Sequence, residues 1–369
     1  MDGPSEHRFP CPTCGSDMRY APAQDLLTCD HCGHTEDMHA EGGPWGSPVI
    51  AELDFRAALA GALDTQEMEE SRTVTCQSCG AEFEFAPDTH AAECPFCASP
   101  VVTDTGANRH IKPRGVLPFL LDEAQARAAM NRWLGKLWFA PSGLAQYARA
   151  GRAMQGIYTP YWTYDARTDS SYTGQRGDAY YVTRPMTVMR DGKPVTVMRQ
   201  ERRIRWRPAS GRVNRVFDDV LVLASRSLET DEAEGLAPWD LSALEPYRPE
   251  FLAGFRAEAY TVPLDEGFAE ARQVIDRTIQ RDVRFDIGGD EQRIQSIDTR
   301  IDAITFKHIL LPVWTAAYRY RGTSYRFVVN GRTGQVRGQR PWSAWKIAAA
   351  VAAGLAVAAV IGFLVASGR

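Results

Sequence analysis

Eight cysteines are the residues of this chain with the clearest chemical meaning, and they form four Cys-x-x-Cys pairs. The first two pairs hold Cys11, Cys14, Cys29 and Cys32, and the second two hold Cys76, Cys79, Cys94 and Cys97. Each cysteine of the second set lies 65 positions after its counterpart in the first. Two such pairs joined by a hairpin supply the four tetrahedral sulfurs of a closed structural zinc site. The spacing therefore predicts two zinc ribbons that hold two structural Zn²⁺ ions.

Disulfide bonds and a redox Cys-x-x-Cys are the alternatives for these cysteines. Disulfides need an oxidising compartment, and the polar segment 1–10 does not resemble a signal peptide. A redox pair would be single and would sit in a βαβ pattern. His31, His34 and His90 lie near the pairs and could replace a ligand. Because four cysteines already complete each site, we expect these histidines to be surface residues.

No catalytic motif accompanies the cysteines. The chain has no phosphate-binding loop, no G-x-S-x-G elbow and no H-E-x-x-H motif. A hydrolase would have to use Asp218, Asp219 or Asp290, but the first two resemble a turn or sheet edge, and the third follows a glycine turn. His110 and His308 are isolated, and we expect both to be structural. The sequence therefore predicts no enzymatic activity.

The 369 residues divide into five predicted segments, with 44% hydrophobic and 24% charged residues overall. They are zinc ribbon 1 at 1–40, a linker with a short helix at 41–70, zinc ribbon 2 at 71–108, an α+β domain at 109–344, and a transmembrane anchor at 345–369. In the linker, Ser47 can cap a helix that continues to Ala60.

Periodicity predicts alternating helices and antiparallel strands in the α+β domain. Apolar spacing favours helices from Asp122 to Trp138 and from Asp265 to about Asp286. The strands are expected at 156–164, 203–207 and 216–224, with a hairpin at 187–197 around Asp191-Gly192 and further strands at 293–329. Two segments, 160–163 and 312–315, share the pattern Pro-x-Trp-Thr. We interpret this repeated pattern as a sign of two related β-meanders within one domain.

The segment Ile347–Ala366 has twenty residues without a charged or polar side chain. At 1.5 Å per residue, such a helix spans about 30 Å, the thickness of the hydrocarbon core. Four basic residues and no acidic one stand just before it: Arg332, Arg337, Arg340 and Lys346. The positive-inside rule then keeps the N-terminal part in the cytoplasm. The sequence predicts a single-pass tail anchor in a bacterial inner membrane.

Small residues recur every four positions along this anchor. They are Ala350, Gly354, Ala358, Gly362 and Ala366. A small-residue stripe lets two transmembrane helices approach closely, which predicts a homo-oligomer, or packing on a partner helix, through this segment. Composition alone is the alternative, because nine of the twenty residues are alanine.

Charge distribution argues against nucleic acid as the partner. The first ribbon holds four carboxylates against Arg8 and Arg19, and no lysine or arginine lies between Cys76 and Cys97. Binding to a polyanion needs cations. An arginine-rich run at 199–215 could contact nucleic acid or anionic lipid, but the alternation of its residues favours the solvent face of a strand.

Several motifs together resemble one bacterial family. The matching segments are the paired Cys-x-x-Cys ribbons, 115–119, 158–162, 217–222, 252–255, 287–290, 306–314 and 329–334. The family comprises zinc-ribbon membrane proteins that are often labelled "primosomal protein N′ (replication factor Y), superfamily II helicase" or "TFIIB-type zinc ribbon-containing protein". The resemblance implies membrane association, and some relatives are linked to phage-shock-type envelope stress. The helicase label does not fit, because the chain lacks a nucleotide-binding loop.

These inferences combine into one expected function. The sequence predicts a zinc-binding, tail-anchored adaptor without catalytic activity, whose ribbons bind protein partners at or near the membrane. The alternative is a membrane-tethered nucleic-acid-binding protein, because zinc ribbons commonly bind DNA or RNA.

Overall fold

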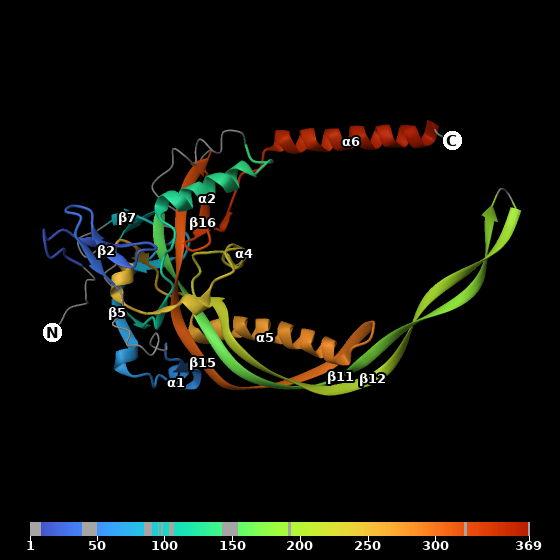
Figure 1. Ribbon diagram of the computed structural model, residues 1–369, viewed down its shortest axis with the longest axis horizontal. Coiled ribbons are helices and arrows are strands. Elements are labelled where there is room, and N and C mark those ends of the chain that lie inside the picture. The colour runs from blue at the N-terminus through green and yellow to red at the C-terminus, as the bar shows by residue number, and fades with distance from the viewer. Residues whose placement is uncertain are drawn as a thin grey trace.

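The computed structural model describes residues 9–38, 50–84, 91–94, 96, 99–102, 107–141, 154–190, 193–320 and 323–367. It confirms a mixed α+β chain with antiparallel sheets, two cysteine clusters near the N-terminus and an apolar C-terminal helix. A nine-stranded sheet forms the centre of the molecule. One hairpin of this sheet extends far beyond the body as a curved arm (Figure 1).

Four long strands dominate the central sheet. They are β11 (Gln155–Arg190), β12 (Lys193–Leu223), β15 (Glu291–Tyr320) and β16 (Thr323–Asn330). All neighbours among them are antiparallel, in the order β12-β11-β15-β16. The short strands of this sheet are β4 (Leu53–Asp54), β10 (Gly115–Val116), β13 (Glu245–Pro246), β14 (Arg256–Ala257) and β17 (Val336–Gly338).

The structure joins several separately predicted strands into two. The segments expected at 156–164 and 187–190 belong to β11, while 193–197, 203–207 and most of 216–224 belong to β12. The glycines and prolines between the segments of one strand lie within that long strand. At Gly174, a Cβ atom would lie 2.5 Å from the Arg293 carbonyl oxygen. This glycine therefore permits close approach of β11 and β15.

The sheet contains one arrangement twice. A short strand, a helix and a long hairpin follow in the order β10, α2, β11, β12 and again in the order β14, α5, β15, β16. Strand β10 pairs in parallel with β15 (Gly115↔Ile309), and β14 pairs in parallel with β11 (Ile157↔Arg256). Each half therefore gives its short strand to the long strand of the other half. The two Pro-x-Trp-Thr segments lie on β11 and β15, which pair with each other.

Helix α5 (Leu264–Ile287) confirms the helix predicted at 265–286 and packs on β11 and β12. Its buried face includes Ala271, Ile275, Ile279 and Val283, which are spaced at helical intervals. Two buried aromatic side chains fix the chain that enters the helix. Trp162 Nε1 donates to the Val262 carbonyl at 3.0 Å, and the Tyr164 hydroxyl donates to that of Leu264 at 2.7 Å. Packing and buried hydrogen bonds thus set the position of α5.

The other helices of the body are shorter. Asp122 caps α2 (Glu123–Gly135), which ends before the predicted Trp138. A correction concerns the linker, where α1 (Phe55–Leu59) begins later than expected because Asp54 accepts from the Ala57 amide and caps it. The predicted cap, Ser47, lies outside the described residues. The part of the chain that the structure describes also contains the helical turn α4 (Thr230–Glu234) and three short 3₁₀ segments at 65–67, 241–243 and 249–252.

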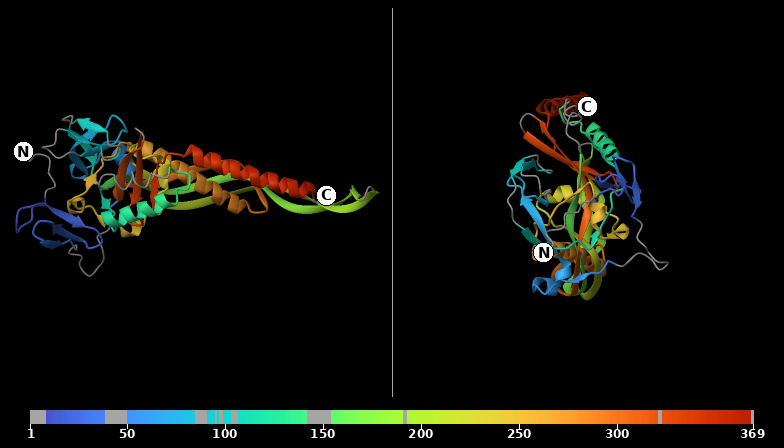
Figure 2. Two further views of the ribbon diagram at one scale, coloured as in Figure 1. Left: turned by 90° about the horizontal axis from the view of Figure 1, so that it is seen from above. Right: turned by 90° about the vertical axis from the view of Figure 1, so that its left-hand side faces the viewer.

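Both cysteine-bearing modules lie against the body (Figure 2). Their strands are β1 (Met18–Ala21), β2 (Leu26–Cys29), β3 (Thr35–Asp37), β5 (Met68–Thr75), β6 (Glu82–Glu84), β7 (Ala91–Glu93), β8 (Pro100–Val102) and β9 (Ala107–Ile111). The first module shares a core with the body, where Tyr20 meets Phe251 edge-on. The second packs Val74 and Phe96 against Ile157 of β11. Each module therefore packs against the body through a shared hydrophobic cluster.

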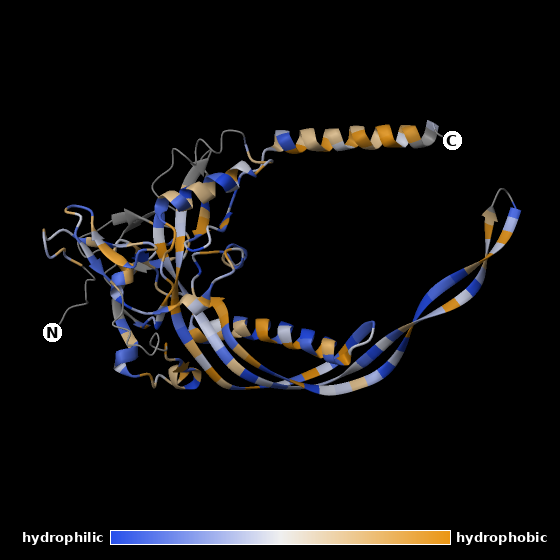
Figure 3. Ribbon diagram, in the orientation of Figure 1, coloured by the Kyte–Doolittle hydropathy of each residue, from blue (hydrophilic) through white to orange (hydrophobic). Residues whose placement is uncertain are grey.

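Helix α6 (Ala344–Ser367) is long and apolar enough to cross a membrane, over Ala344–Leu364. None of this span is buried in the structure. Figure 3 shows that hydrophobic residues follow one another along most of this helix. Near its start, Lys346 Nζ donates to the Ala140 carbonyl at 2.7 Å. The helix is therefore joined to the body at one end and leaves its apolar side chains exposed.

Candidate metal centres

The first two cysteine pairs sit on turns that their own backbone closes. The Gly15 amide donates to the Cys11 carbonyl at 2.8 Å, and the Gly33 amide donates to that of Cys29 at 2.9 Å. Both glycines have φ of 74°, which a residue with a side chain rarely adopts. Hydrogen bonds from the Ser16 amide, and then from its hydroxyl, lower the pKa of Cys14 to about 6. The turn thus favours the thiolate that binds metal.

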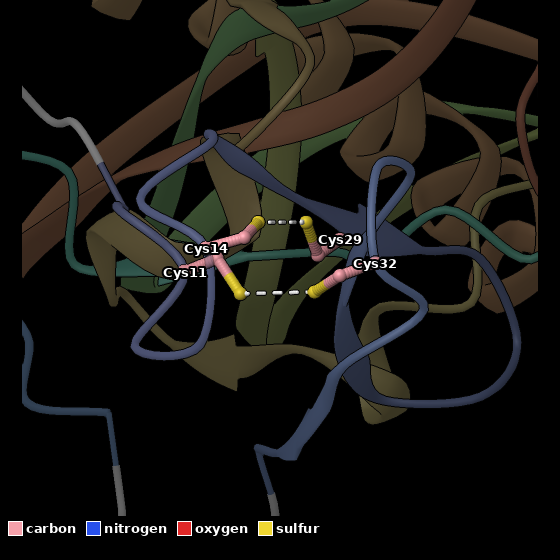
Figure 4. A group of neighbouring side chains, drawn as sticks. All are labelled: Cys11, Cys14, Cys29 and Cys32. Carbon is pink, nitrogen blue, oxygen red and sulfur yellow. Dashed lines mark hydrogen bonds between the residues drawn. The ribbon is translucent and has the colours of Figure 1, made fainter.

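The four sulfurs of the first cluster converge on one point (Figure 4). Cys11 Sγ lies 3.5 Å from Cys32 Sγ, and Cys14 Sγ lies 3.5 Å from Cys29 Sγ. All four sulfurs are within 4.8 Å of one another. Around a tetrahedral ion with bonds of about 2.3 Å, sulfurs stand about 3.8 Å apart. The spacing therefore leaves room for one metal ion among them.

The second cluster has the same local geometry in its described part. The sulfurs of Cys76, Cys79 and Cys94 lie within 4.8 Å of one another. Cys79 Sγ and Cys94 Sγ, which correspond to Cys14 and Cys29, are 3.6 Å apart. Gly80 closes the turn with φ of 73°. The predicted fourth ligand, Cys97, lies outside the described residues, as does His90.

Both clusters offer sulfur donors of the kind that hold Zn²⁺ in structural sites. The seven described cysteines are all free thiols. In the first cluster Cys11 and Cys29 are buried against the body, while Cys14 and Cys32 are exposed. His31 is exposed, and His34 contributes its backbone carbonyl to the Cys29 amide at 2.8 Å. The clusters can therefore bind metal through cysteine alone.

A second group of ligand-type side chains lies where three long strands pair irregularly. Asp165 is on β11, Asp218 and Asp219 are on β12, and Lys307 is on β15. The carboxylates of the three aspartates lie within 4.8 Å of one another. The register of β11 and β12 shifts beside Asp165, and Asp219 has φ of 52°. The sequence placed the Asp218–Asp219 pair at a turn or edge but did not connect it with the other two residues.

Lys307 already supplies positive charge to this acidic group. Its Nζ lies 2.8 Å from Asp219 Oδ1, 3.4 Å from Glu52 Oε1 and 3.9 Å from Asp165 Oδ2. Burial disfavours the ammonium, but the surrounding carboxylates raise the pKa of Lys307 above its usual range. The arrangement is an ion-pair network that ties three strands together, and we assign no metal to it.

Asp165 should make the stability of the protein depend on pH. Burial, followed by its hydrogen bond with Glu52, raises the pKa of Asp165 to about 7 from 3.8. The pKa of Asp165 is higher in the folded than in the unfolded chain, so the protonated carboxyl favours the folded state. Its contribution to the free energy of unfolding is full below about pH 4 and is lost as pH rises through about 7. We therefore expect Asp165→Asn to raise the melting temperature more at about pH 8 than at about pH 6.

Thermal unfolding of the detergent-solubilised protein in zinc-containing buffer measures this effect. Asp302→Asn is the matched control, because Asp302 pairs with Arg300 on the exposed surface. An equal change in melting temperature at both pH values for Asp165→Asn would refute the assignment.

A buried polar network lies beneath the second cluster. The Arg326 guanidinium donates to Glu232 at 2.6 Å and to the Ser227 carbonyl. The Ser225 hydroxyl donates to Glu258 at 2.5 Å, and burial raises the pKa of Glu258 to about 8. Arg326 and Ser227 also line a cavity of about 280 Å³ beside Cys79 and Phe96. This network was not predicted from the sequence. The only hint in the sequence is an arginine, Arg326, next to an apolar run in its strand.

The other polar residues that the sequence singled out have structural partners. His308 is buried, and its Nδ1 donates to the Ile111 carbonyl at 2.7 Å. Burial lowers the pKa of His308 to about 4. His110 packs edge-on against the Tyr260 ring. Asp290 lies apart from the acidic group and accepts from the Ala179 amide at 2.7 Å. The structure therefore brings Asp218 and Asp219 together with Asp165, but not with Asp290.

Comparison with known proteins gives similarity without a stated activity. No family model matches the chain, and no solved structure matches it. The chain is 24% identical over 346 residues to a Bacillus subtilis (strain 168) protein named "Uncharacterized protein YdjG", and the aligned part covers 92% of each chain. The chain is thus similar, along almost its whole length, to a bacterial protein.

Proposed function

We propose that this protein is a membrane-anchored adaptor that binds two structural Zn²⁺ ions and has no catalytic activity. Helix α6 crosses the inner membrane of a bacterium, and the rest of the chain faces the cytoplasm. The two cysteine modules present rigid surfaces to protein partners at or near the membrane.

The observation that carries this proposal is the exposed apolar surface of α6. The same chain holds both cysteine modules against its body by hydrogen bonds and apolar contacts. Leu355 is 67% exposed and Phe363 is 72% exposed. An apolar surface of this length needs lipid or another protein around it. At the other end, the Tyr20 amide donates to the Ala253 carbonyl at 2.9 Å, and the Ala259 amide donates to that of Glu82 at 3.0 Å. Both modules are thus held in fixed orientations, as docking surfaces require.

Zinc fits the donor sets and the proposed compartment. The cytoplasm keeps thiols reduced, so that four thiolates remain free to bind metal. In the proposal, Cys97 completes the second site together with Cys76, Cys79 and Cys94. The basic residues before α6, such as Arg340 and Lys346, favour the cytoplasmic side for the body.

Charged residues in the middle of α6 should release the protein from the membrane. Each arginine at the centre of a bilayer costs about 2.5–3.5 kcal/mol, so the double variant Leu355→Arg/Ala358→Arg should insert poorly. We expect the wild-type chain to remain in the membrane pellet after alkaline carbonate extraction and the variant to appear in the supernatant. Leu355→Ala/Ala358→Leu is the matched control and should stay in the pellet. Extraction of the wild-type protein would refute the anchor.

The adaptor role needs a test that separates protein from nucleic-acid partners. Affinity purification of the full chain from detergent-solubilised membranes should enrich the same proteins in repeated experiments. Those proteins should be lost from the variant Cys29→Ser/Cys94→Ser, whose modules cannot hold metal. Submicromolar DNA binding that weakens steeply with salt in a gel-shift titration would instead support the nucleic-acid alternative.

A further inference from the structure

The β11–β12 hairpin continues well past the rest of the sheet. Pairing between β11 and β15 ends at Gly177↔Glu291, whereas β11 and β12 remain paired from Asp178↔Arg205 to Arg190↔Lys193. The outer part of the hairpin is therefore a two-stranded ribbon (Figure 2). We call residues 178–184 and 199–207 the stem, and residues 185–190 and 193–198 the tip. A two-stranded ribbon has no core of its own, so the side chains of the tip need another environment.

Several arginines of the stem lie near carboxylates. Arg202 pairs with Glu291 at 2.9 Å, and both Arg184 and Arg203 approach Glu201. The arginines at 202–207 lie on strand β12, as expected, but the residues between them are only half-buried, because the ribbon has no core on either face. Arg207 approaches Asp178 at 3.9 Å, and Arg205 lies over the Tyr180 ring. Most arginines of the stem therefore already have a carboxylate or ring neighbour, whereas Arg199 lies at its boundary with the tip.

Apolar side chains lie on both faces of the tip, and the Thr187–Thr196 pair stands between them on one face. On one face, Met186 pairs with Val197, and Val188 pairs with Val195. On the other face, Pro185 pairs with Met198, and Met189 pairs with Pro194. Met189 is 71% exposed and Met198 is 68% exposed. Flexible methionines on an exposed surface can adapt to an irregular apolar environment.

Unmatched cations lie beside these apolar side chains. Within the described chain, neither Lys193 nor Arg199 has a carboxylate oxygen within 4.0 Å. Arg199 instead contacts the Met186 sulfur at 3.8 Å. From Arg184 to Arg199 the sequence holds four cations and a single acid, Asp191. Aliphatic side chains of the tip thus lie next to two cations, Lys193 within the tip and Arg199 at its border with the stem, that have no carboxylate partner among the described residues.

We propose that the tip inserts its aliphatic side chains into the headgroup region of an anionic lipid bilayer, while Lys193 and Arg199 bind lipid phosphates. Apolar insertion and attraction to anionic headgroups add together at such surfaces. This inference rests on the proposed membrane anchor, because α6 brings the bilayer close to the hairpin.

The shape of the molecule agrees with contact at the surface of the bilayer. The hairpin curves toward the side on which α6 lies, so that its tip returns toward the level of that helix (Figure 1). The ribbon cannot cross lipid, because both of its edges leave backbone groups unpaired. Residues 339–343, which include Pro341, have no regular structure between β17 and α6. Hydrogen bonds from the Ser343 amide to the Phe139 carbonyl and from Lys346 Nζ to the Ala140 carbonyl hold the start of α6 on the body. A bilayer that surrounds α6 therefore lies on the side toward which the tip curves.

Nucleic acid and a second copy of the chain fit the tip less well. Single-stranded nucleic acid is commonly held by stacking on aromatic rings, and residues 185–198 contain no aromatic side chain. Two tips facing each other would bring like charges together, which opposes association. Anionic lipid satisfies both the apolar and the cationic side chains.

Photocrosslinking of the full-length protein in vesicles tests the contact. A diazirine amino acid replaces Met198 in the tip or, as the matched control, Val216 on the same strand, which is 70% exposed near the body. Vesicles contain phosphatidylethanolamine with phosphatidylglycerol, or phosphatidylcholine alone. We expect about tenfold more lipid adducts at position 198 than at position 216 in anionic vesicles, and a loss of about tenfold in the variant Lys193→Glu/Arg199→Glu. Two single variants provide a further comparison. Lys193→Arg, which keeps the positive charge, should form more lipid adducts than Lys193→Glu.

Equal adduct yields at positions 198 and 216 in the anchored protein would overturn the inference. Adducts with added RNA in place of lipid, or between two copies of the chain, would overturn it as well. Alkaline extraction of the same samples reports on the anchor separately. Protein that is extracted while position 198 still forms lipid adducts would refute the proposed anchor but not the contact of the tip.

Discussion

Replacing Cys29 with serine is expected to remove one of two bound zinc ions and to unfold the first cysteine module. Cys29 is buried, and its sulfur lies 3.5 Å from that of Cys14. Structural zinc contributes about 10–16 kcal/mol to the folding of small zinc-dependent modules. The described module buries only a few apolar side chains of its own, so it cannot replace that contribution. The zinc content measured by metal analysis should therefore fall from about two equivalents per chain to about one.

The loss should extend beyond the module itself. Tyr20 and Leu27 belong to the same buried cluster as Phe119 and Trp314 of the body. Unfolding of the module would expose that side of the body to water and lower its stability. We expect a lower melting temperature for the whole chain in the variant Cys29→Ser, measured by circular dichroism in detergent.

The control for this experiment is a histidine within the same turn. His31 lies between Cys29 and Cys32 and is exposed, so His31→Ala should retain both zinc ions and the wild-type melting temperature. Retention of two zinc equivalents by Cys29→Ser, or loss of one by His31→Ala, would show that the ligand assignment is wrong.

Replacing Arg326 with methionine is expected to destabilise the protein by about 3–5 kcal/mol, because the substitution leaves Glu232 buried without its partner. Arg326 is 9% exposed and Glu232 is 7% exposed. Their side chains meet at 2.6 Å beneath the second cysteine module. The free energy of unfolding, measured by denaturant titration of the detergent-solubilised protein, should show this loss.

A double variant distinguishes loss of the pair from loss of side-chain volume. Arg326→Met/Glu232→Leu removes both charges and should recover most of the stability, since two apolar side chains can replace a buried ion pair. Arg19→Met provides an exposed comparison, because Arg19 and Asp30 also meet at 2.6 Å but are 54% and 66% exposed. That loss should be at most about 1 kcal/mol. A double variant as unstable as Arg326→Met would count against the ion-pair explanation.

Features that depend on local spacing could be predicted from the sequence. The ligands of the first cluster lie within 22 consecutive residues, so the spacing of Cys11 to Cys32 is enough to predict a four-sulfur site. The helical repeat of Ala271, Ile275 and Ile279 likewise predicts α5. The apolar run at 347–366 predicts a helix able to span a membrane. In each case the relevant contacts lie within one segment of chain.

Features that depend on sheet register could not be predicted in this way. Lys307 meets Asp165 and Asp219 only because three strands pair irregularly at one level. Arg326 and Glu232 are 94 residues apart, and no local pattern links them. The tip of the hairpin has the alternating apolar pattern of a half-buried strand at Met186, Val195 and Val197, although all three side chains are exposed. Sequence pattern reports which side chains are apolar, whereas the fold decides what covers them.

The exchange of short strands between the two halves has a consequence for synthesis. Gly115 of β10 pairs with Ile309 of β15, which is synthesised almost 200 residues later. Strand β10 therefore cannot form this pairing until β15 has left the ribosome. The first half therefore emerges with an open sheet edge that its own residues cannot fill. Long-range pairing of this kind slows folding and exposes unpaired edges to aggregation. The cysteine modules can bind metal early in translation, whereas the body can close only after both halves have been made.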